Sequence, residues 1–296
     1  MPALDGRVAI ITGAGRGIGR EHALLFAAEG AKVVVNDLGG DNDGSDTDAT
    51  PAEQVVAEIA SAGGEAVVST HDVSDWESAH AMINAAVEAF GDLDILVNNA
   101  GILRDRAIVN MTEPEWDDIV AVHLKGHFAP TRWAATHWRE EHKSGRSRPR
   151  HVVHTSSTSG LFSNPGQSNY GSAKSAIATF SQIAAKELAR YGVTSNCVVP
   201  AARTRLTLAT PGLEDIMAAR DGAFDEWAPA NVSPLVAYLC STLCAFNGET
   251  FFVQGGVVRR LRSWEMAESV EQREAWTVDT LAEALESVAS SLTGVE

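Results

Sequence analysis

The sequence has few cysteines, a deficit of basic residues and no long apolar run. Its 296 residues include three cysteines, which are too few for a disulfide framework and lack the spacing of a zinc site. No apolar stretch is long enough to span a bilayer, and the first residues do not resemble a signal peptide. These absences predict a cytoplasmic protein without a metal site or a membrane partner.

Acidic residues outnumber basic ones by 39 to 23, and the formal net charge is −16. This charge argues against nucleic acid and anionic membrane surfaces as partners. It does not exclude an anionic cofactor, because the N-terminus of one helix can hold a phosphate group even in an acidic protein. The apolar fraction of 45% is ample for the core of a large α/β domain.

An apolar run near the start breaks into glycines and then resumes with helical spacing. Residues Val8–Ile11 are predicted to form a buried strand, and a helical pattern begins at Ile18. The turn between them contains Arg16 and four glycines, Gly13, Gly15, Gly17 and Gly19. Such a turn before a helix N-terminus is an anion site, because free backbone N–H groups face the ligand and glycine lets the backbone approach it. We therefore predict that this stretch binds the phosphates of a dinucleotide.

Strand-like segments alternate with helical ones along the chain. This alternation predicts an α/β fold, a Rossmann-like doubly wound parallel sheet of about seven strands with helices on both faces. Ligands bind at the carboxyl ends of the strands in such a sheet, where Asp37, Asp72 and Asn99 fall. Asp37 can accept both ribose hydroxyls of an adenosine and would repel a 2′-phosphate, whereas Arg16 could neutralise one. We give Asp37 the greater weight and predict NAD as the cofactor.

Tyr170 and Lys174 are four residues apart on a predicted helix, so they share one face. A phenol with a pKa of about 10 is a poor base at neutral pH, and a nearby ammonium lowers that pKa. The pair therefore predicts a tunable general acid/base. The Ser157 hydroxyl, at the end of the neighbouring strand, could hold the reacting oxygen by a hydrogen bond.

These motifs together resemble those of the short-chain dehydrogenase/reductase family over about residues 6–257. The resemblance implies that Ser157 orients the substrate oxygen and that Tyr170 exchanges its proton. It also implies that Lys174 binds the nicotinamide ribose and lowers the pKa of Tyr170, while the nicotinamide ring gives or takes a hydride. The further cofactor contacts that it implies are Ile18, Val73, Ala100, Gly101, Pro200 and Thr204.

Four segments resemble a narrower group within this family. The group comprises the (3R)-hydroxyacyl-CoA dehydrogenase domains of type 2 multifunctional β-oxidation enzymes and their stand-alone bacterial relatives. The segments are residues 35–41, 99–106, 122–126 and 166–170. This resemblance implies NAD-dependent oxidation of a fatty or steroid-side-chain acyl-CoA. It also implies a homo-tetramer or homo-dimer formed through two long helices.

The chain departs from the family pattern at three places, one of which is Arg16, where an NAD-specific member is expected to have a small residue. Many members have a catalytic asparagine where this chain has His123, and a glycine where it has Ala201. We interpret His123 as part of a water or proton relay near Lys174, with a histidine that is satisfied within its own helix as the alternative. Because of the change at Ala201, either Thr204 or Thr207 could contact the nicotinamide amide.

Residues 1–262 are predicted to form one catalytic domain, with a substrate lid over about 203–229. A helical tail over 263–296 is expected to pack on its own subunit or on a neighbour. Arg203 and Arg205 in the lid could reach CoA phosphates or could be solvated. The remaining local predictions are a surface loop over 39–52, a helix started by a capping box from Ser74 to Glu77, and a solvated basic loop over 142–150.

Three functions are compatible with these patterns. The first is an NAD-dependent (3R)-3-hydroxyacyl-CoA dehydrogenase. The second is a short-chain dehydrogenase that acts on a free steroid or another carbonyl compound, and the third is a catalytically idle NAD-binding regulatory protein. The intact set of Ser157, Tyr170 and Lys174 argues against the third function, and the narrower resemblance favours the first.

Overall fold

The computed structural model describes residues 2–39, 50–208, 212–219, 222–266 and 268–292. They belong to two compact units, Met1–Leu261 and Arg262–Glu296. The second unit contains one described helix, α11 (Val278–Leu292), after a non-helical stretch. The first unit contains the sheet and the candidate site.

The first unit is built on an eight-stranded sheet in the order β3-β2-β1-β4-β5-β6-β7-β8. Its strands are β1 (Val8–Thr12), β2 (Lys32–Asn36), β3 (Glu65–Ser69), β4 (Ile95–Asn98), β5 (Arg150–Thr155), β6 (Val193–Pro200), β7 (Thr250–Gln254) and β8 (Val257–Leu261). The first seven are parallel, which confirms the predicted doubly wound sheet. The eighth was not predicted. It returns antiparallel beside β7 through a tight glycine turn and forms the exposed edge of the sheet.

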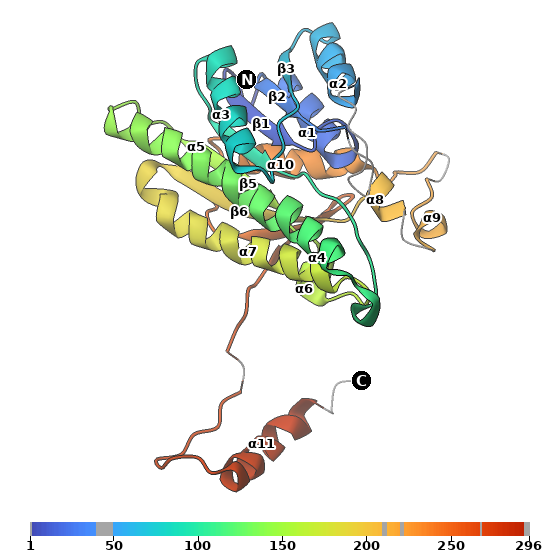
Figure 1. Ribbon diagram of the computed structural model, residues 1–296, viewed down its shortest axis with the longest axis vertical. Helices are drawn as coiled ribbons and strands as arrows, with labels where there is room; N and C mark the ends of the chain where they lie inside the picture. Colours follow the sequence, from blue (N-terminus) through green and yellow to red (C-terminus); the bar gives the residue numbers. More distant parts are fainter. Residues whose placement is uncertain (1, 40–49, 209–211, 220–221, 267, 293–296) are drawn as a thin grey trace. The chain divides into compact units, whose positions relative to one another are not determined.

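Helices cover both faces of this sheet (Figure 1). On one face lie α1 (Gly17–Ala28), α2 (Thr50–Ser61) and α10 (Ser233–Leu239). On the other lie α3 (Trp76–Phe90), α5 (Gly126–Lys143) and α7 (Ser168–Leu188). None of the helices that the structure describes is long and apolar enough to cross a membrane.

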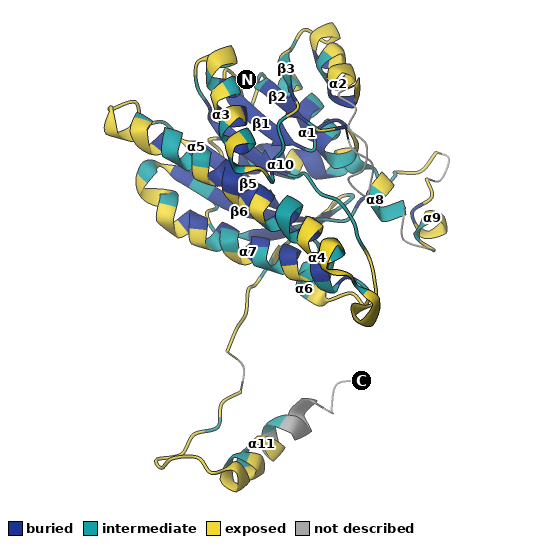
Figure 2. Cartoon of the chain, viewed as in Figure 1, coloured by how far each residue is buried: buried dark blue, intermediate teal, exposed yellow. Residues whose placement is uncertain are grey.

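Two apolar layers bury the sheet, as Figure 2 shows by the dark strands between helices with exposed outer faces. Successive side chains of β1 point to opposite faces, so Ala9 and Ile11 join the layer under α1, whereas Val8 and Ile10 join the layer under α3. All five residues of β1 are buried. This is the reason that Val8–Ile11 of this strand are continuously apolar rather than alternating.

Two local predictions, the cap of one helix and the end of one surface loop, are wrong. Helix α3 is capped by Asp75, whose carboxylate accepts a 2.7 Å hydrogen bond from a backbone N–H one turn later. The predicted cap, Ser74, instead donates to the Asp72 carboxylate in the turn after β3. Helix α2 begins at Thr50, and Ala52 is buried, so the predicted surface loop ends earlier than 52. Residues 40–49 of that loop lie outside the described residues.

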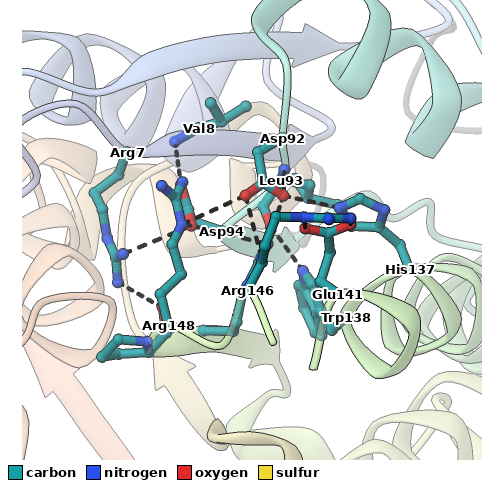
Figure 3. Close-up of polar contacts among 12 residues, drawn as sticks. Arg7, Val8, Asp92, Leu93, Asp94, His137, Trp138, Glu141, Arg146 and Arg148 are labelled. Carbon is teal, nitrogen blue, oxygen red and sulfur yellow. Dashed lines mark hydrogen bonds and ion pairs between the residues drawn. The ribbon is translucent and has the colours of Figure 1, made fainter. Parts of the chain in front are cut away.

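The basic segment over 142–150 is not a solvated loop along its whole length. Helix α5 continues to Lys143, and Arg150 begins β5 with only 2% of its surface exposed. Asp92, Asp94 and Arg148, labelled in Figure 3, belong to the ion-pair network that accounts for this burial, at the amino ends of β4 and β5. Arg150 contacts Asp92 at 2.8 Å, and Arg148 pairs with the fully buried Asp94. In this network the carboxylates and the guanidinium groups compensate one another's charges, whose burial would otherwise destabilise the fold.

Candidate active site

A cavity of about 600 Å³ opens at the carboxyl ends of the strands. It lies where the strand order reverses between β1 and β4, which is the usual ligand position in such sheets. Most of the predicted site residues line it: Gly13, Arg16, Gly17, Ile18, Asp37, Asp72, Val73, Asn99, Ala100, Gly101, His123, Ser157, Tyr170, Lys174, Pro200 and Thr204. The remaining two, Gly15 and Gly19, shape the glycine turn behind the cavity wall.

The glycine turn has no room for side chains at its base. A Cβ atom on Gly19 would overlap the Gly13 carbonyl oxygen. Gly13 itself has a φ of 64°, and a Cβ there would lie 2.8 Å from the Cα of Ala100. The Thr12 hydroxyl accepts hydrogen bonds from the backbone N–H groups of Asn99 and Ala100, at 2.9 and 3.0 Å. The turn after β1 and the turn after β4 are therefore locked together.

The chemistry of this turn fits the pyrophosphate of a dinucleotide. Gly17 and Ile18, at the start of α1, line the cavity, and none of the described residues in the first turn of this helix is acidic. No carboxylate of this first turn therefore competes with a phosphate for the helix N–H groups and the positive end of the helix dipole. Asn99 does not reach into the cavity as a donor, because its amide nitrogen donates to the carbonyl oxygens of Thr12 and Gly13.

Asp37 follows β2 and is held in one position by backbone groups. One carboxylate oxygen accepts a 2.8 Å hydrogen bond from Gly15 N–H, and the other accepts a 2.6 Å bond from Gly39 N–H. Arg16 lies at the same end of the cavity, with its guanidinium 3.5 Å from the Gly39 carbonyl oxygen. The two residues with opposed implications for the cofactor are therefore neighbours.

Tyr170 and Lys174 project from the first turns of α7 toward the end of β5. The Lys174 ammonium donates a 2.7 Å hydrogen bond to the Thr155 carbonyl oxygen and lies 5.6 Å from the centre of the Tyr170 ring. Ser157 caps the short helix α6 (Thr158–Phe162) and forms a hydrogen bond with the Tyr170 side chain. One strand end and one helix thus bring the three predicted catalytic groups together.

The shift in the Tyr170 pKa is opposite to the one expected from the sequence. Burial raises the pKa of Tyr170 to about 12, the Ser157 hydrogen bond opposes this rise, and the charge of Asp105 adds to it. Burial also lowers the pKa of Lys174 to about 7. The lysine is therefore only partly charged near neutral pH. This weakens the lowering of the Tyr170 pKa that was expected from its charge.

His123 lies in a π-helical segment, Val120–Lys125, between α4 (Glu113–Ile119) and α5. It is 1% exposed, with Nε2 2.8 Å from the Ile102 carbonyl oxygen and its ring edge-on to Tyr170 at 5.1 Å between centres. Among the described residues, its buried Nδ1 has no hydrogen-bond partner. Burial and the Lys174 charge hold the pKa of His123 well below its usual value, so the ring is neutral.

The segment predicted as a substrate lid, residues 203–229, is only partly directed at the cavity. Leu206, Leu213 and Met217 line the cavity from α8 (Arg205–Leu208), α9 (Leu213–Ile216) and the residue that follows α9. Arg203 does not line the cavity, because its guanidinium pairs with Asp225. Arg205 does line it.

Both candidate threonines, Thr204 and Thr207, also line the cavity and lie 3.2 Å apart through their hydroxyls. Thr204 is the one beside the glycine turn, since a Cβ on Gly17 would lie 3.6 Å from its methyl group. These distances therefore favour neither Thr204 nor Thr207 as the residue that contacts the nicotinamide amide. Thr204 lies nearer the glycine turn, which is predicted to bind the phosphates.

Sequence reasoning missed the residues that hold the loop before α7, residues 163–167, and the first turn of α7. Asp105 accepts a 2.6 Å hydrogen bond from the Gln167 amide, and the Asn169 amide donates to the carbonyl oxygens of Arg104 and Glu115. These residues lie in or beside segments that resemble the narrower family group, but the sequence alone assigned no role to them. Their pairing joins residues about sixty positions apart, for which no local pattern exists.

Comparison with known proteins places this site in a family. The model of the short chain dehydrogenase family matches residues 7–209. The chain is 46% identical over 244 residues to the peroxisomal multifunctional enzyme type 2 of Drosophila melanogaster, covering 82% of this chain and 38% of that protein. It is 43% identical over 255 residues to the hydroxyacyl-CoA dehydrogenase ChsB1 of Mycobacterium tuberculosis, covering 85% and 78%. The chain thus spans well under half the length of the Drosophila protein.

Solved structures show the same fold. A short chain dehydrogenase from Mycobacterium avium superposes with a TM-score of 0.85 at 45% identity, over 99% of this chain and 96% of that one. A 3-ketoacyl-(acyl-carrier-protein) reductase from Brucella melitensis, solved with NADH, superposes with a TM-score of 0.73 at 30% identity, over 86% and 98%. The chain therefore belongs to the short-chain dehydrogenase/reductase family, as an oxidoreductase with a site for a nicotinamide cofactor.

Proposed function

We propose that this chain is an NAD-dependent dehydrogenase that interconverts a (3R)-3-hydroxyacyl-CoA and its 3-oxoacyl-CoA, with a fatty or steroid-side-chain acyl group. The observation that carries the proposal is that Ser157, Tyr170 and Lys174 line the same cavity as the glycine turn. An acid/base group therefore lies beside the groups that would hold a dinucleotide. The acyl-CoA is supported by the name of the Mycobacterium tuberculosis relative.

Tyr170 is the acid/base of the proposed reaction. It gives its phenolic proton to the substrate oxygen during reduction and takes that proton back during oxidation. The raised pKa keeps the phenol protonated at neutral pH, so proton donation is favoured there and oxidation speeds up as the pH rises. A bound nicotinamide ring supplies the hydride donor or acceptor. Ser157, hydrogen-bonded to Tyr170, orients the same substrate oxygen.

Lys174 and His123 complete the proposed machinery. The Lys174 ammonium, held by the Thr155 carbonyl oxygen, would hold the hydroxyls of the nicotinamide ribose. If His123 donates from Nε2 to the Ile102 carbonyl oxygen, its Nδ1 has a free lone pair for a relay that includes Lys174. A neutral ring with one satisfied and one open nitrogen suits a proton relay more than a purely structural role.

Asp37 is the basis for proposing NAD rather than NADP. Its two oxygens are pinned by backbone N–H groups, so the carboxylate cannot swing away from a 2′-phosphate. The repulsion would outweigh the attraction from Arg16, which sits on a longer and more adaptable side chain. The Brucella structure with NADH is consistent with this choice.

We further propose the organisation that the family resemblance implied. Residues 1–262 form the catalytic domain with its lid over 203–229, and the tail over 263–296 packs on this subunit or a neighbour. The chain forms a homo-dimer or a homo-tetramer through α5 and α7. The protein is located in the cytoplasm. Phe128 on α5 and Ile183 on α7 are exposed apolar residues on these helices, as such an interface requires.

The test is a substrate panel with the purified chain. It contains (3R)- and (3S)-3-hydroxyacyl-CoA thioesters and free steroid alcohols, each with NAD and with NADP, and turnover is read as reduced nicotinamide absorbance. We expect turnover of the (3R)-thioesters with NAD. Turnover of a free alcohol and of no thioester would overturn the acyl-CoA assignment. Binding of NAD without turnover of any substrate would favour the regulatory protein.

Tyr170→Phe is the matched variant for the mechanism. It should bind NAD with unchanged affinity, since the phenyl ring keeps its place, and should lose turnover by at least about 100-fold. A Tyr170→Phe protein with full turnover would exclude this residue as the acid/base.

A further inference from the structure

Tyr170 follows a short loop that is unusually constrained. The loop begins after α6 at Ser163, the only non-glycine residue with positive φ in the described part of the chain (63°). A positive φ at a residue with a side chain is retained only where the surroundings impose it. The loop ends at Gln167, which is buried, and α7 starts at the next residue.

A strap over residues 104–106 holds this loop from the side of α4. Arg106 forms a parallel bridge with Gln167, and its N–H donates to the Gly166 carbonyl oxygen at 2.8 Å. The Asp105 carboxylate accepts a 2.6 Å hydrogen bond from the Gln167 amide. The Gln167 amide oxygen in turn accepts a 3.0 Å bond from Asn164, so the loop is closed on itself as well as on the strap.

The strap also reaches Tyr170 through Asn169, which is fully buried. The Asn169 amide nitrogen donates to the Arg104 and Glu115 carbonyl oxygens, at 3.0 and 2.9 Å. Its oxygen accepts a 2.7 Å bond from the Tyr170 N–H. Movement of the strap would therefore move the first turn of α7, where Tyr170 lies.

We propose that Asp105 is a positioning residue for Tyr170: its hydrogen bond with Gln167 fixes the loop over residues 163–167 and thereby the start of α7. The proposal rests on the proposed function, because it assigns the acid/base role to Tyr170. Asp105 is given no contact with the substrate or the cofactor and acts only through the loop and through its charge.

The negative charge of Asp105 contributes to the raised pKa of Tyr170, after burial as the main cause. His123 packs on the Tyr170 ring from the π-helical segment and is neutral, and Lys174 lies one turn further along the same helix. Ser157 contributes an uncharged hydroxyl from the end of β5. On the strap itself, the flanking arginines pair with α4 carboxylates, Arg104 with Asp118 and Arg106 with Glu115.

A negative charge near a phenol favours its protonated form, and the charge of Asp105 acts on Tyr170 in this sense. This charge adds to the clamp as a second way in which Asp105 acts on Tyr170. Removal of the charge should lower the pKa of Tyr170, whereas removal of the clamp should disturb geometry without this shift. The two roles are therefore separable by substitution.

Asp105→Asn removes the charge and keeps an oxygen that can accept from Gln167. The phenolate of Tyr170 can be read directly by ultraviolet difference absorbance in a Tyr191→Phe/Tyr238→Phe background, because the chain has three tyrosines. We expect Asp105→Asn to lower the titration midpoint by about half a unit, or about a threefold larger phenolate fraction at a fixed alkaline pH. The pH profile of kcat for alcohol oxidation should shift by the same amount.

Two further variants control this result. Gln167→Leu keeps the Asp105 charge and breaks the clamp, so kcat should fall about tenfold without a lower titration midpoint. Asp117→Asn removes an exposed charge on α4 and should change neither readout. If the asparagine protein does not fold, Asp105→Ser removes the same charge from a smaller side chain.

Coincident titrations of the parent and Asp105→Asn proteins, or an equal shift in Asp117→Asn, would overturn the charge role of Asp105. Unchanged kcat in Gln167→Leu would overturn the clamp. The absence of thioester turnover in the parent protein would instead count against the proposed function. The tyrosine titration does not depend on the substrate, so the two failures are distinguishable.

Discussion

The Nζ atom of Lys174 donates a 2.7 Å hydrogen bond to the carbonyl oxygen of Thr155, the last residue of β5. Lys174 is 3% exposed, so this carbonyl group replaces only part of the hydration that the ammonium loses on burial. The site therefore holds a charge that is unfavourable for the fold and useful for binding a ribose. This relationship has a measurable consequence for stability.

Lys174→Met should abolish turnover and stabilise the fold, most strongly at low pH. The pKa of Lys174 is lowered from 10.5 to about 7 in the folded chain. Between about pH 7 and pH 10.5 the unfolded chain therefore binds a proton at Lys174 that the folded chain does not bind. The free energy of unfolding of the parent protein thus rises with pH across this window. Below about pH 7 the full penalty applies, so the variant should gain on the order of 3–5 kcal/mol there and progressively less toward pH 10.5.

Urea unfolding at both ends of the window measures this effect. Lys186→Met, at an exposed lysine of the same helix, is the matched control for the loss of a lysine side chain. A gain for Lys174→Met that is equal at both ends would show that packing, not charge, is responsible.

Asp37→Asn should move the cofactor preference from NAD toward NADP. The amide keeps the shape of the side chain and one acceptor for the Gly15 N–H, but it no longer repels a 2′-phosphate. We expect the ratio of kcat/KM for NADP to that for NAD to rise by about tenfold or more. Arg16→Ala should lower the same ratio. If Asp37→Asn leaves the ratio unchanged, Asp37 does not discriminate between the cofactors.

Gly19→Ala should destabilise the fold and prevent cofactor binding. The added Cβ would overlap the Gly13 carbonyl oxygen and lie 2.6 Å from the Asn99 amide nitrogen, so the whole turn must move. We expect a loss of more than about 2 kcal/mol in unfolding free energy. Gly256→Ala is the matched control, since a Cβ there meets nothing within 4 Å. Thermal unfolding with and without NAD measures both effects, and equal behaviour of the two variants would contradict the close packing of the turn.

Five buried histidines should make the protein sensitive to mild acid. Burial lowers the pKa values of all five, which are His22, His123, His127, His151 and His154. Below about pH 6.5 the unfolded chain takes up protons that the folded chain does not, so stability falls as the pH falls through this range. Each such histidine contributes about 1.4 kcal/mol per pH unit to the slope.

His154→Leu should reduce this slope by one proton. The pKa of His154 is lowered to about 3, so the parent residue contributes over the whole mild-acid range. Unfolding free energies from about pH 6.5 to 4.5 measure the slope, whatever the variant does to stability at neutral pH. His142→Gln, at an exposed histidine, is the matched control for the loss of an imidazole. An undiminished slope in His154→Leu would mean that this histidine is charged in the folded chain.

The sheet was predictable because its signals are local. Three patterns are contiguous in the chain: the run Val8–Ile11, the glycine turn and the helical spacing after Ile18. Strand β1 and helix α1 lie where these patterns predicted them. The pairing of Tyr170 with Lys174 was also local, since both belong to one helix. The edge strand β8 was not predicted. Val257 and Val258 are adjacent and do not alternate with polar residues, so no strand pattern distinguishes this segment from a loop after Gly255.

The sequence by itself determined the family of folds, the position of the glycine turn and the three groups that meet at the cavity, because spacing along one strand or helix sets which side chains share an edge. Only the tertiary structure decided how each group behaves. Burial between distant segments raised the pKa of Tyr170 instead of lowering it and made Arg150 part of a buried ion-pair network. It also joined Asp105 to Gln167 across sixty-two positions. Desolvation and long-range pairing depend on which segments meet, and no pattern in a short stretch records that.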